Sequence, residues 1–180
     1  MKKILFKEIE IPEGVEVKID GSVIIVNGKE GKNKREFNLN GLELKKEGNK
    51  IILGSKKATK KEKKRINTTI AHINNMVKGV QEKFRYELKI CFSHFPFTLD
   101  IKNDEVLVKN FLGEKIPRKK KISKGVDIKI DKQKIIVESV SKELAGQAAA
   151  DLERVTLVRG RDRRIFQDGI FMINKAGREL

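Results

Sequence analysis

The sequence of 180 residues has few of the side chains that build enzyme active sites. It contains one cysteine, Cys91, and two histidines, His72 and His94. No CxxC or HExxH spacing occurs, and neither a GxGxxG nor a GxxxxGK[ST] phosphate loop is found. A Ser-His-Asp site stays open, because its members can lie far apart in a sequence. We therefore expect no metal and no cofactor, and a protein that binds rather than an enzyme.

Segments that would direct the chain to a membrane or to an oxidising compartment are also lacking. Cys91 has no second cysteine to pair with, which suits a reducing compartment. No window has the length and hydrophobicity of a transmembrane helix, and no apolar stretch follows Met1-Lys2-Lys3 as in a signal peptide. We expect a cytoplasmic protein with neither a membrane partner nor a small-molecule substrate.

Acidic residues are too few to balance the basic ones. Lysine and arginine number 41 against 25 aspartates and glutamates, which gives a net charge of +16. In a protein of this size such an excess indicates nucleic-acid binding. Aromatic residues make up only 6% and tryptophan is absent, so stacking platforms for single strands are poor. Recognition of folded RNA by its shape and phosphates suits this composition better.

The hydrophobic pattern describes a unit that occurs twice. Residues 15–19 and 23–26 read as two strands around an Asp20-Gly21 hairpin turn. Residues 99–101 and 106–108 repeat this hairpin in the second half. The chain is therefore predicted to contain an internal duplication.

Each unit is predicted to close with an amphipathic helix. Thr59 and Glu62 have the spacing of a capping box, and Ser141 is the expected N-cap of the second helix. The apolar stripes are Ile66, Ile70, Ile73 and Val77 in the first helix and Leu144, Ala148, Leu152 and Val155 in the second. Lys78-Gly79 and Arg159-Gly160 are the expected helix ends, because a cation and a left-handed glycine both suit a C-terminus.

The second unit has a strand before it and a segment after it. Apolar residues alternate over residues 84–92, which predicts a strand. Residues 161–180 have no counterpart in the repeat. The predicted fold class is α+β, with two tandem repeats of a small antiparallel sheet packed with one helix, plus a basic C-terminal tail. The predicted domains are residues 1–82, residues 83–160 and a C-terminal extension, residues 161–180.

Cations are concentrated in three clusters. They are Lys56, Lys57, Lys60, Lys61, Lys63, Lys64 and Arg65, then Arg118, Lys119, Lys120 and Lys121, and finally Arg159, Arg161, Arg163 and Arg164. The first cluster serves either as a solubilising helix face or as an RNA contact. The second serves either as a charged edge strand that discourages aggregation or as an RNA contact. In the third cluster, a favourable charge at the helix end explains Arg159 but not the other three arginines. We interpret these as phosphate contacts, because the planar guanidinium of arginine can bind a phosphate through two hydrogen bonds.

The arginine segment also contains apolar residues that a solvated tail would not need. Ile165 and Phe166 precede Asp168-Gly169, which reads as a turn, and Ile170 and Phe171 follow it. We expect these apolar side chains to pack the segment against its own domain. They would thereby direct the arginines towards RNA.

Four motifs, in order along the chain, give a resemblance to a known family. They are Asn75-Met76-Val77-Lys78-Gly79-Val80, His94-Phe95-Pro96, Asn110-Phe111-Leu112-Gly113-Glu114-Lys115, and Asp162-Arg163-Arg164-Ile165-Phe166-Gln167-Asp168-Gly169-Ile170. With the duplication, they resemble the sixth protein of the large ribosomal subunit, the L-six family, in its archaeal and eukaryotic form. One departure is Phe171, where the family motif often continues with tyrosine.

The resemblance implies a structural ribosomal protein whose two domains share one fold. Its second domain would contact large-subunit ribosomal RNA near the base of the factor-binding stalk and the sarcin-ricin loop, beside neighbouring ribosomal proteins. The alternative is a stand-alone RNA- or DNA-binding protein or an RNA-processing enzyme. The candidate RNA-binding residues are Asn110, Phe111, Lys115, Arg118, Lys119, Lys120, Lys121, Arg159, Arg161, Arg163, Arg164, Phe166, Asp168, Gly169 and Lys175.

Overall fold

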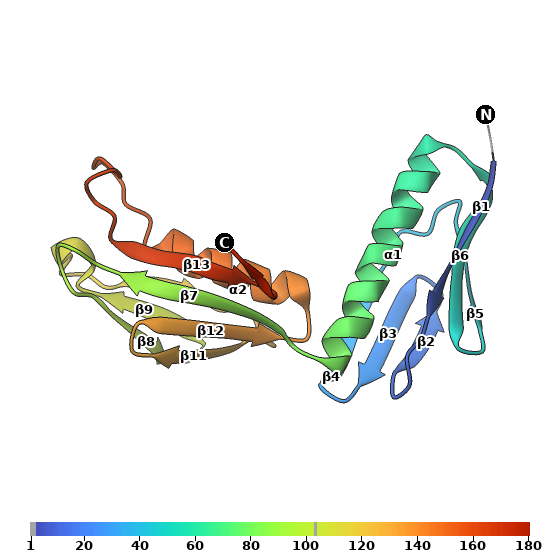
Figure 1. The fold of residues 1–180 in the computed structure, drawn as a ribbon, viewed down its shortest axis with the longest axis horizontal. Coiled ribbons are helices and arrows are strands. Elements are labelled where there is room, and N and C mark those ends of the chain that lie inside the picture. Colours follow the sequence, from blue (N-terminus) through green and yellow to red (C-terminus); the bar gives the residue numbers. More distant parts are fainter. Residues whose placement is uncertain (1–2, 103) are drawn as a thin grey trace. The chain divides into compact units, whose positions relative to one another are not determined.

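A computed structural model describes residues 3–102 and 104–180 (Figure 1). The chain divides into two compact units, Met1–Lys83 and Phe84–Leu180. Each unit combines antiparallel strands with one long helix, so the predicted α+β class is confirmed.

Unit 1 contains two three-stranded sheets and helix α1 (Lys60–Gln81). One sheet has the order β2-β3-β4, with β2 spanning Glu16–Asp20, β3 Val23–Gly28 and β4 Gly31–Glu36. The other has the order β1-β6-β5, with β1 spanning Lys3–Glu10, β6 Lys50–Ala58 and β5 Glu43–Glu47. Alternate residues of the central strands, such as Ile24 and Val26, are fully buried, which is why these sequences form half-buried strands.

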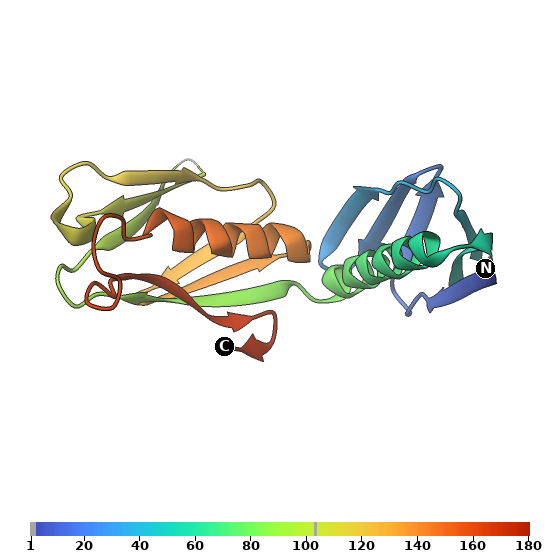
Figure 2. The same ribbon diagram turned by 90° about the horizontal axis from the view of Figure 1, so that it is seen from above.

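Unit 2 contains a three-stranded and a five-stranded sheet. The smaller has the order β10-β9-β8, with β8 spanning Thr98–Lys102, β9 Glu105–Lys109 and β10 Arg118–Lys121; a short 3-10 turn, η1 (Phe111–Gly113), lies between β9 and β10. The larger has the order β11-β12-β7-β13-β14, with β7 spanning Phe84–Cys91, β11 Asp127–Asp131, β12 Lys134–Ser139, β13 Gly169–Lys175 and β14 Arg178–Glu179. Helix α2 (Lys142–Val155) packs against β7, β12 and β13 (Figure 2).

The two units repeat one topology. Strands β7 to β12 follow the order of β1 to β6, and the sheet order β11-β12-β7 repeats β5-β6-β1. Strand β13 is the difference between the units. It pairs antiparallel with one edge of β7. The corresponding edge of β1, the counterpart of β7, is unpaired among the described residues of unit 1. The predicted strand over residues 84–92 is confirmed as β7, whose buried residues alternate.

The predicted helix starts are confirmed and the predicted ends are wrong. Thr59 and Glu62 form the capping box of α1, and the Ser141 side chain accepts a hydrogen bond from the Leu144 amide. Helix α1 continues to Gln81, because burial of Val80 favours another helical turn despite Gly79. 

Helix α2 ends earlier than predicted, at Val155, and the side chain of the next residue links this end to β13. The Thr156 hydroxyl accepts a hydrogen bond from the Ile170 amide at the start of β13 (2.9 Å). Gly160 does adopt a left-handed conformation, with φ of 68°, but it lies in the loop beyond the helix. 

The C-terminal segment takes part in the sheet of unit 2. Residues 169–175 form β13, so this part of the predicted extension lies inside the fold. Of the apolar residues expected to pack the segment down, Ile170 is 2% exposed and belongs to the core. Ile165 and Phe171 are 64% and 43% exposed, so the expectation is wrong for these two side chains.

Because Ile170 fills the core of unit 2, Ile170→Ala should lower the free energy of unfolding by about 2–5 kcal/mol. Urea denaturation followed by circular dichroism measures this change. Ile173→Ala, on the exposed side of the same strand, is the control and should change stability by about 0.5 kcal/mol or less. Equal losses of stability from the two substitutions would contradict the position of Ile170 in the core.

Candidate nucleic-acid interface

Cations from three segments surround the C-terminal end of α2. Arg154 lies in the last turn of the helix, Arg159 follows it, and β10 lies alongside. They border a hollow of about 520 Å³, the basic hollow, lined by Arg118, Lys119, Lys120, Asp151, Arg154, Val155 and Arg159. Cations are favoured here because the last carbonyls of a helix carry partial negative charge. The fold thus brings most of the second cation cluster beside Arg159, the first arginine of the third cluster.

Arg118 is held by several contacts within unit 2. Its Nη1 donates to the carbonyls of Val155 (2.9 Å) and Leu157 (3.0 Å), which caps the end of α2. Its Nε and Nη2 donate to Glu114, and its guanidinium lies 4.4 Å from the centre of the buried Phe111 ring. Arg118 therefore joins η1 and the following residues to the end of the helix.

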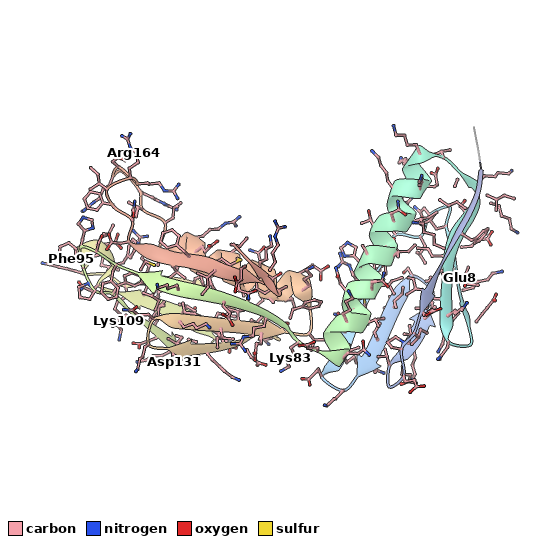
Figure 3. The ribbon with its side chains drawn as sticks, in the orientation of Figure 1. Glu8, Lys83, Phe95, Lys109, Asp131 and Arg164 are labelled. Atoms are coloured by element: carbon pink, nitrogen blue, oxygen red, sulfur yellow. The ribbon has the colours of Figure 1, made fainter. Side chains whose placement is uncertain are left out.

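The arginine loop, residues 157–168, is ordered by Asp162. The Asp162 carbonyl accepts hydrogen bonds from the amides of Ile165 and Phe166, and its side chain accepts one from the Arg164 amide. The same carboxylate pairs with the Arg164 guanidinium at 2.8 Å, which lowers the pKa of Asp162. Figure 3 labels Arg164 where it points away from the loop. Among the described residues, Arg163 has neither a hydrogen-bond nor an ion-pair partner.

The loop ends at a buried carboxylate, that of Asp168, which is 2% exposed. Its Oδ1 accepts hydrogen bonds from the backbone amides of Ser93 (2.8 Å) and His94 (3.0 Å). Its Oδ2 lies 2.6 Å from Nδ1 of His94. Burial alone would raise the pKa of Asp168, but the hydrogen bonds from His94 and Ser93 outweigh it and lower the pKa from 3.8 to about 2. The carboxylate therefore fixes the loop to the residues that follow β7.

A stack of side chains extends from this carboxylate to the surface. The His94 ring stacks on the Phe166 ring, with centroids 4.5 Å apart and planes inclined by 23°. The Arg161 guanidinium lies 4.8 Å from the centre of the Phe166 ring, within cation–π distance. Phe166 is half-buried and contacts Arg161. This contact supports the expectation that an apolar side chain of the segment directs an arginine.

The contact of Ser93, His94 and Asp168 is not arranged for nucleophilic catalysis. Ser93 Oγ lies 3.1 Å from His94 Nδ1, the same nitrogen that faces Asp168. A catalytic triad needs the serine and the carboxylate on opposite ring nitrogens. Residues 3–102 and 104–180 contain no group of three or more His, Cys, Asp or Glu side chains that could hold a metal ion. None of the described helices is long and apolar enough to cross a membrane.

The remaining predicted site residues lie in different environments. Phe111 is buried and packs edge-on against Phe97, and Gly169 is buried beside Thr156. Asn110 adopts a left-handed conformation and donates from its side chain to the Pro96 carbonyl (2.9 Å). Asn110 is exposed, as are the basic candidates Lys115, Lys119, Lys120, Lys121, Arg159, Arg161, Arg163, Arg164 and Lys175. Lys120 pairs with Asp151 at 3.3 Å.

Lys175 is the one exposed candidate at the far end of β13. Six residue-to-residue steps of extended strand, about 20 Å, separate it from Gly169 at the loop. The structure therefore does not bring Lys175 to the end of α2.

Three residues with clear roles at this interface were absent from the sequence-based set. Arg154 is the one cation in the last turn of α2 and belongs to no cluster in the sequence. The packing of β10 against the helix places it among other cations. Ser93 and His94 donate amide hydrogen bonds to Asp168, which lies about 75 residues further along the chain. The His94-Phe95-Pro96 motif was the signal that could have found His94.

The sequence matches the family model described as ribosomal protein L6 over residues 11–83 and 95–169. The chain belongs to the ribosomal protein L6 family. It is 42% identical over 177 residues to the large ribosomal subunit protein uL6 of Methanococcus vannielii, covering 98% of this chain and 97% of that protein. The uL6 of Methanobrevibacter smithii is 41% identical over 169 residues, or 94% and 95% of the two chains. The expected family, its archaeal type and the expected non-enzymatic character are confirmed.

Because the folded-state pKa of Asp168 is lowered, its stabilising contribution should be present above about pH 5 and lost as the pH falls through 2. Asp168→Asn should therefore destabilise unit 2 by about 2 kcal/mol at pH 7 and by much less near pH 2. Urea denaturation of both proteins across this range measures the difference.

Asp100→Asn is the control, because Asp100 pairs with Lys109 at the surface of the same unit. It should change stability little at any pH. A pH-independent difference between Asp168→Asn and the unsubstituted protein would show that the charge of Asp168 is not the source of its contribution.

Proposed function

We propose that this protein is a structural component of the large ribosomal subunit that binds large-subunit ribosomal RNA near the factor-binding stalk base and the sarcin-ricin region. Its relatives of the same length carry the name large ribosomal subunit protein, which supports incorporation into that particle beside other ribosomal proteins. The cytoplasmic location expected from the sequence agrees with this role. The observation that carries the RNA part of the proposal is the group of cations around the end of α2.

Several of these cations have no charge partner within the described residues. Lys119, Arg154, Arg159 and Arg163 form neither a hydrogen bond nor an ion pair through their side chains in residues 3–102 and 104–180. All four are exposed. Lys119, Arg154 and Arg159 line the basic hollow, and Arg163 lines a neighbouring hollow that also contains Arg154. A phosphate backbone supplies the matching charges, and its neutralisation releases counterions.

Other candidates support the interface from beneath. Arg118 uses its donors on Glu114 and on the end of α2, and Asp168 uses its carboxylate on Ser93 and His94. In the proposed mechanism these residues fix the backbone from which the free cations project. Lys115 and Lys121 are exposed cations before and at the end of β10, whereas Lys175 lies apart from this group at the far end of β13. In this mechanism the function is binding, and the cations contact the phosphates of a folded RNA.

Arg163→Ala and Lys119→Ala should each weaken binding to a transcript of the sarcin-ricin region of large-subunit RNA. Each loses about one phosphate contact, so the slope of log K against log salt should become shallower by about 0.9. Filter binding or fluorescence anisotropy over a salt series measures both quantities.

Lys132→Ala removes the same charge at the turn between β11 and β12 and is the matched control. Figure 3 labels its neighbour Asp131 at the lower edge of unit 2 and Arg164 at the top of the loop. The control should keep the slope and affinity of the unsubstituted protein. The proposal fails if the three variants have the same affinity and salt slope. It also fails if the unsubstituted protein does not sediment with large ribosomal subunits in a density gradient.

A further inference from the structure

A second hollow, of about 770 Å³, lies beside the basic hollow. It is bounded by the end of α2, the start of β13 and the arginine loop. Its apolar lining consists of Cys91, Leu157, Val158, Phe166, Ile170 and Phe171. Arg154, Arg163 and Arg164 also line it. We call it the apolar hollow, because apolar side chains and cations meet there in one cavity of ligand size.

Phe171 gives this hollow a flat aromatic surface. The side chain is 43% exposed although it follows the buried Ile170. Its ring lies against the backbone of Gly169, where an added Cβ would come within 3.3 Å of the ring. Gly169 therefore makes room for the ring beside the strand. A half-exposed phenylalanine in a cavity offers a surface on which a planar ligand can stack.

One polar group of the hollow, the Glu153 carboxylate, can bind the edge of a base. Glu153 accepts a hydrogen bond from the Met172 amide through Oε1 (2.8 Å). Its Oε2 has no hydrogen-bond partner in the described part of the chain, so it can accept from a ligand N–H. Each of the four RNA bases presents at least one such donor.

Arg154 connects the two hollows, because it lines both of them. A phosphate on Arg154 would thus lie at the boundary between an apolar cavity and a strongly cationic one. Arg163, with no partner among the described residues, offers a second phosphate contact on the loop side. Nucleotides have this same combination of a flat, weakly polar ring and an anionic group.

We propose that the apolar hollow binds a single unstacked nucleobase of the ribosomal RNA. The base stacks on Phe171, and its phosphate lies against Arg154 and Arg163. This inference rests on the proposed function and adds a defined subsite to it. The cost of unstacking one base is offset by the new stacking contact and by the phosphate contacts at the rim.

The test uses the full-length, isotope-labelled protein and the four nucleoside 5′-monophosphates, with ribose 5-phosphate as the ligand without a base. In NMR titrations the nucleotides should shift the amide resonances of Gly169 and Ile170. They should also bind about tenfold or more tightly than ribose 5-phosphate, as a stacked base does. Nucleotide affinity no greater than that of ribose 5-phosphate would overturn the proposal.

Three variants make the test specific. Phe171→Leu keeps an apolar side chain without the ring and should remove the preference for nucleotides, whereas Phe171→Tyr should retain it. Phe6→Leu changes a phenylalanine of similar exposure, 40%, in unit 1 and should have no effect. An unchanged preference in Phe171→Leu would overturn the nucleobase site.

The same variants separate this inference from the function on which it rests. With the sarcin-ricin transcript, Phe171→Leu should bind about tenfold more weakly at an unchanged salt slope. If Phe171→Leu binds the transcript normally while Arg163→Ala binds weakly, the nucleobase site fails and the RNA-binding proposal stands. If the unsubstituted protein does not bind the transcript, the proposed function fails, and the nucleotide titrations still decide whether the hollow holds a base.

Discussion

The buried carboxylate of Asp168 is the interaction on which the interface depends. It brings together two segments about 75 residues apart by accepting the amides of Ser93 and His94 and facing the imidazole of His94. A carboxylate buried without these donors would cost several kcal/mol, so its position is strongly specified. The next residue begins β13, and the arginine loop therefore ends at a fixed point.

The loop is equally well fixed where it begins. Thr156 is bonded to Ile170, and Arg118 holds the carbonyls of Val155 and Leu157. Between these two anchors the arginines project from a short, internally hydrogen-bonded turn at Asp162. Because the backbone that carries these cations is already fixed, binding orders their side chains but costs little backbone conformational freedom. Residues of both anchors, Thr156, Asp168 and Ile170, also line the apolar hollow.

The sequence predicted the features that depend on neighbouring residues. The capping box at Thr59, the N-cap at Ser141 and the alternation in β7 are all local patterns. The sequence did not predict the end of α2, where Arg118 of β10 bonds the Val155 carbonyl, or the partners of Asp168. Both sets of contacts join residues that are distant in the chain. The duplication gave no template for β13, which has no counterpart among the described residues of unit 1. Cation clusters were visible, but only the fold shows that Arg118 is engaged internally and that Arg154 joins them.

Hydrogen exchange in the RNA-free protein tests most directly whether the arginine loop is fixed before RNA binds. The amide protons of Ser93 and His94 point to Asp168, and that of Ile170 points to Thr156. If the loop is held by these bonds, the three amides should exchange slowly, together with the neighbouring amides of β13. If these amides exchange at the rate of an unstructured chain and become protected only when RNA is added, the loop is not fixed before binding and the account is contradicted.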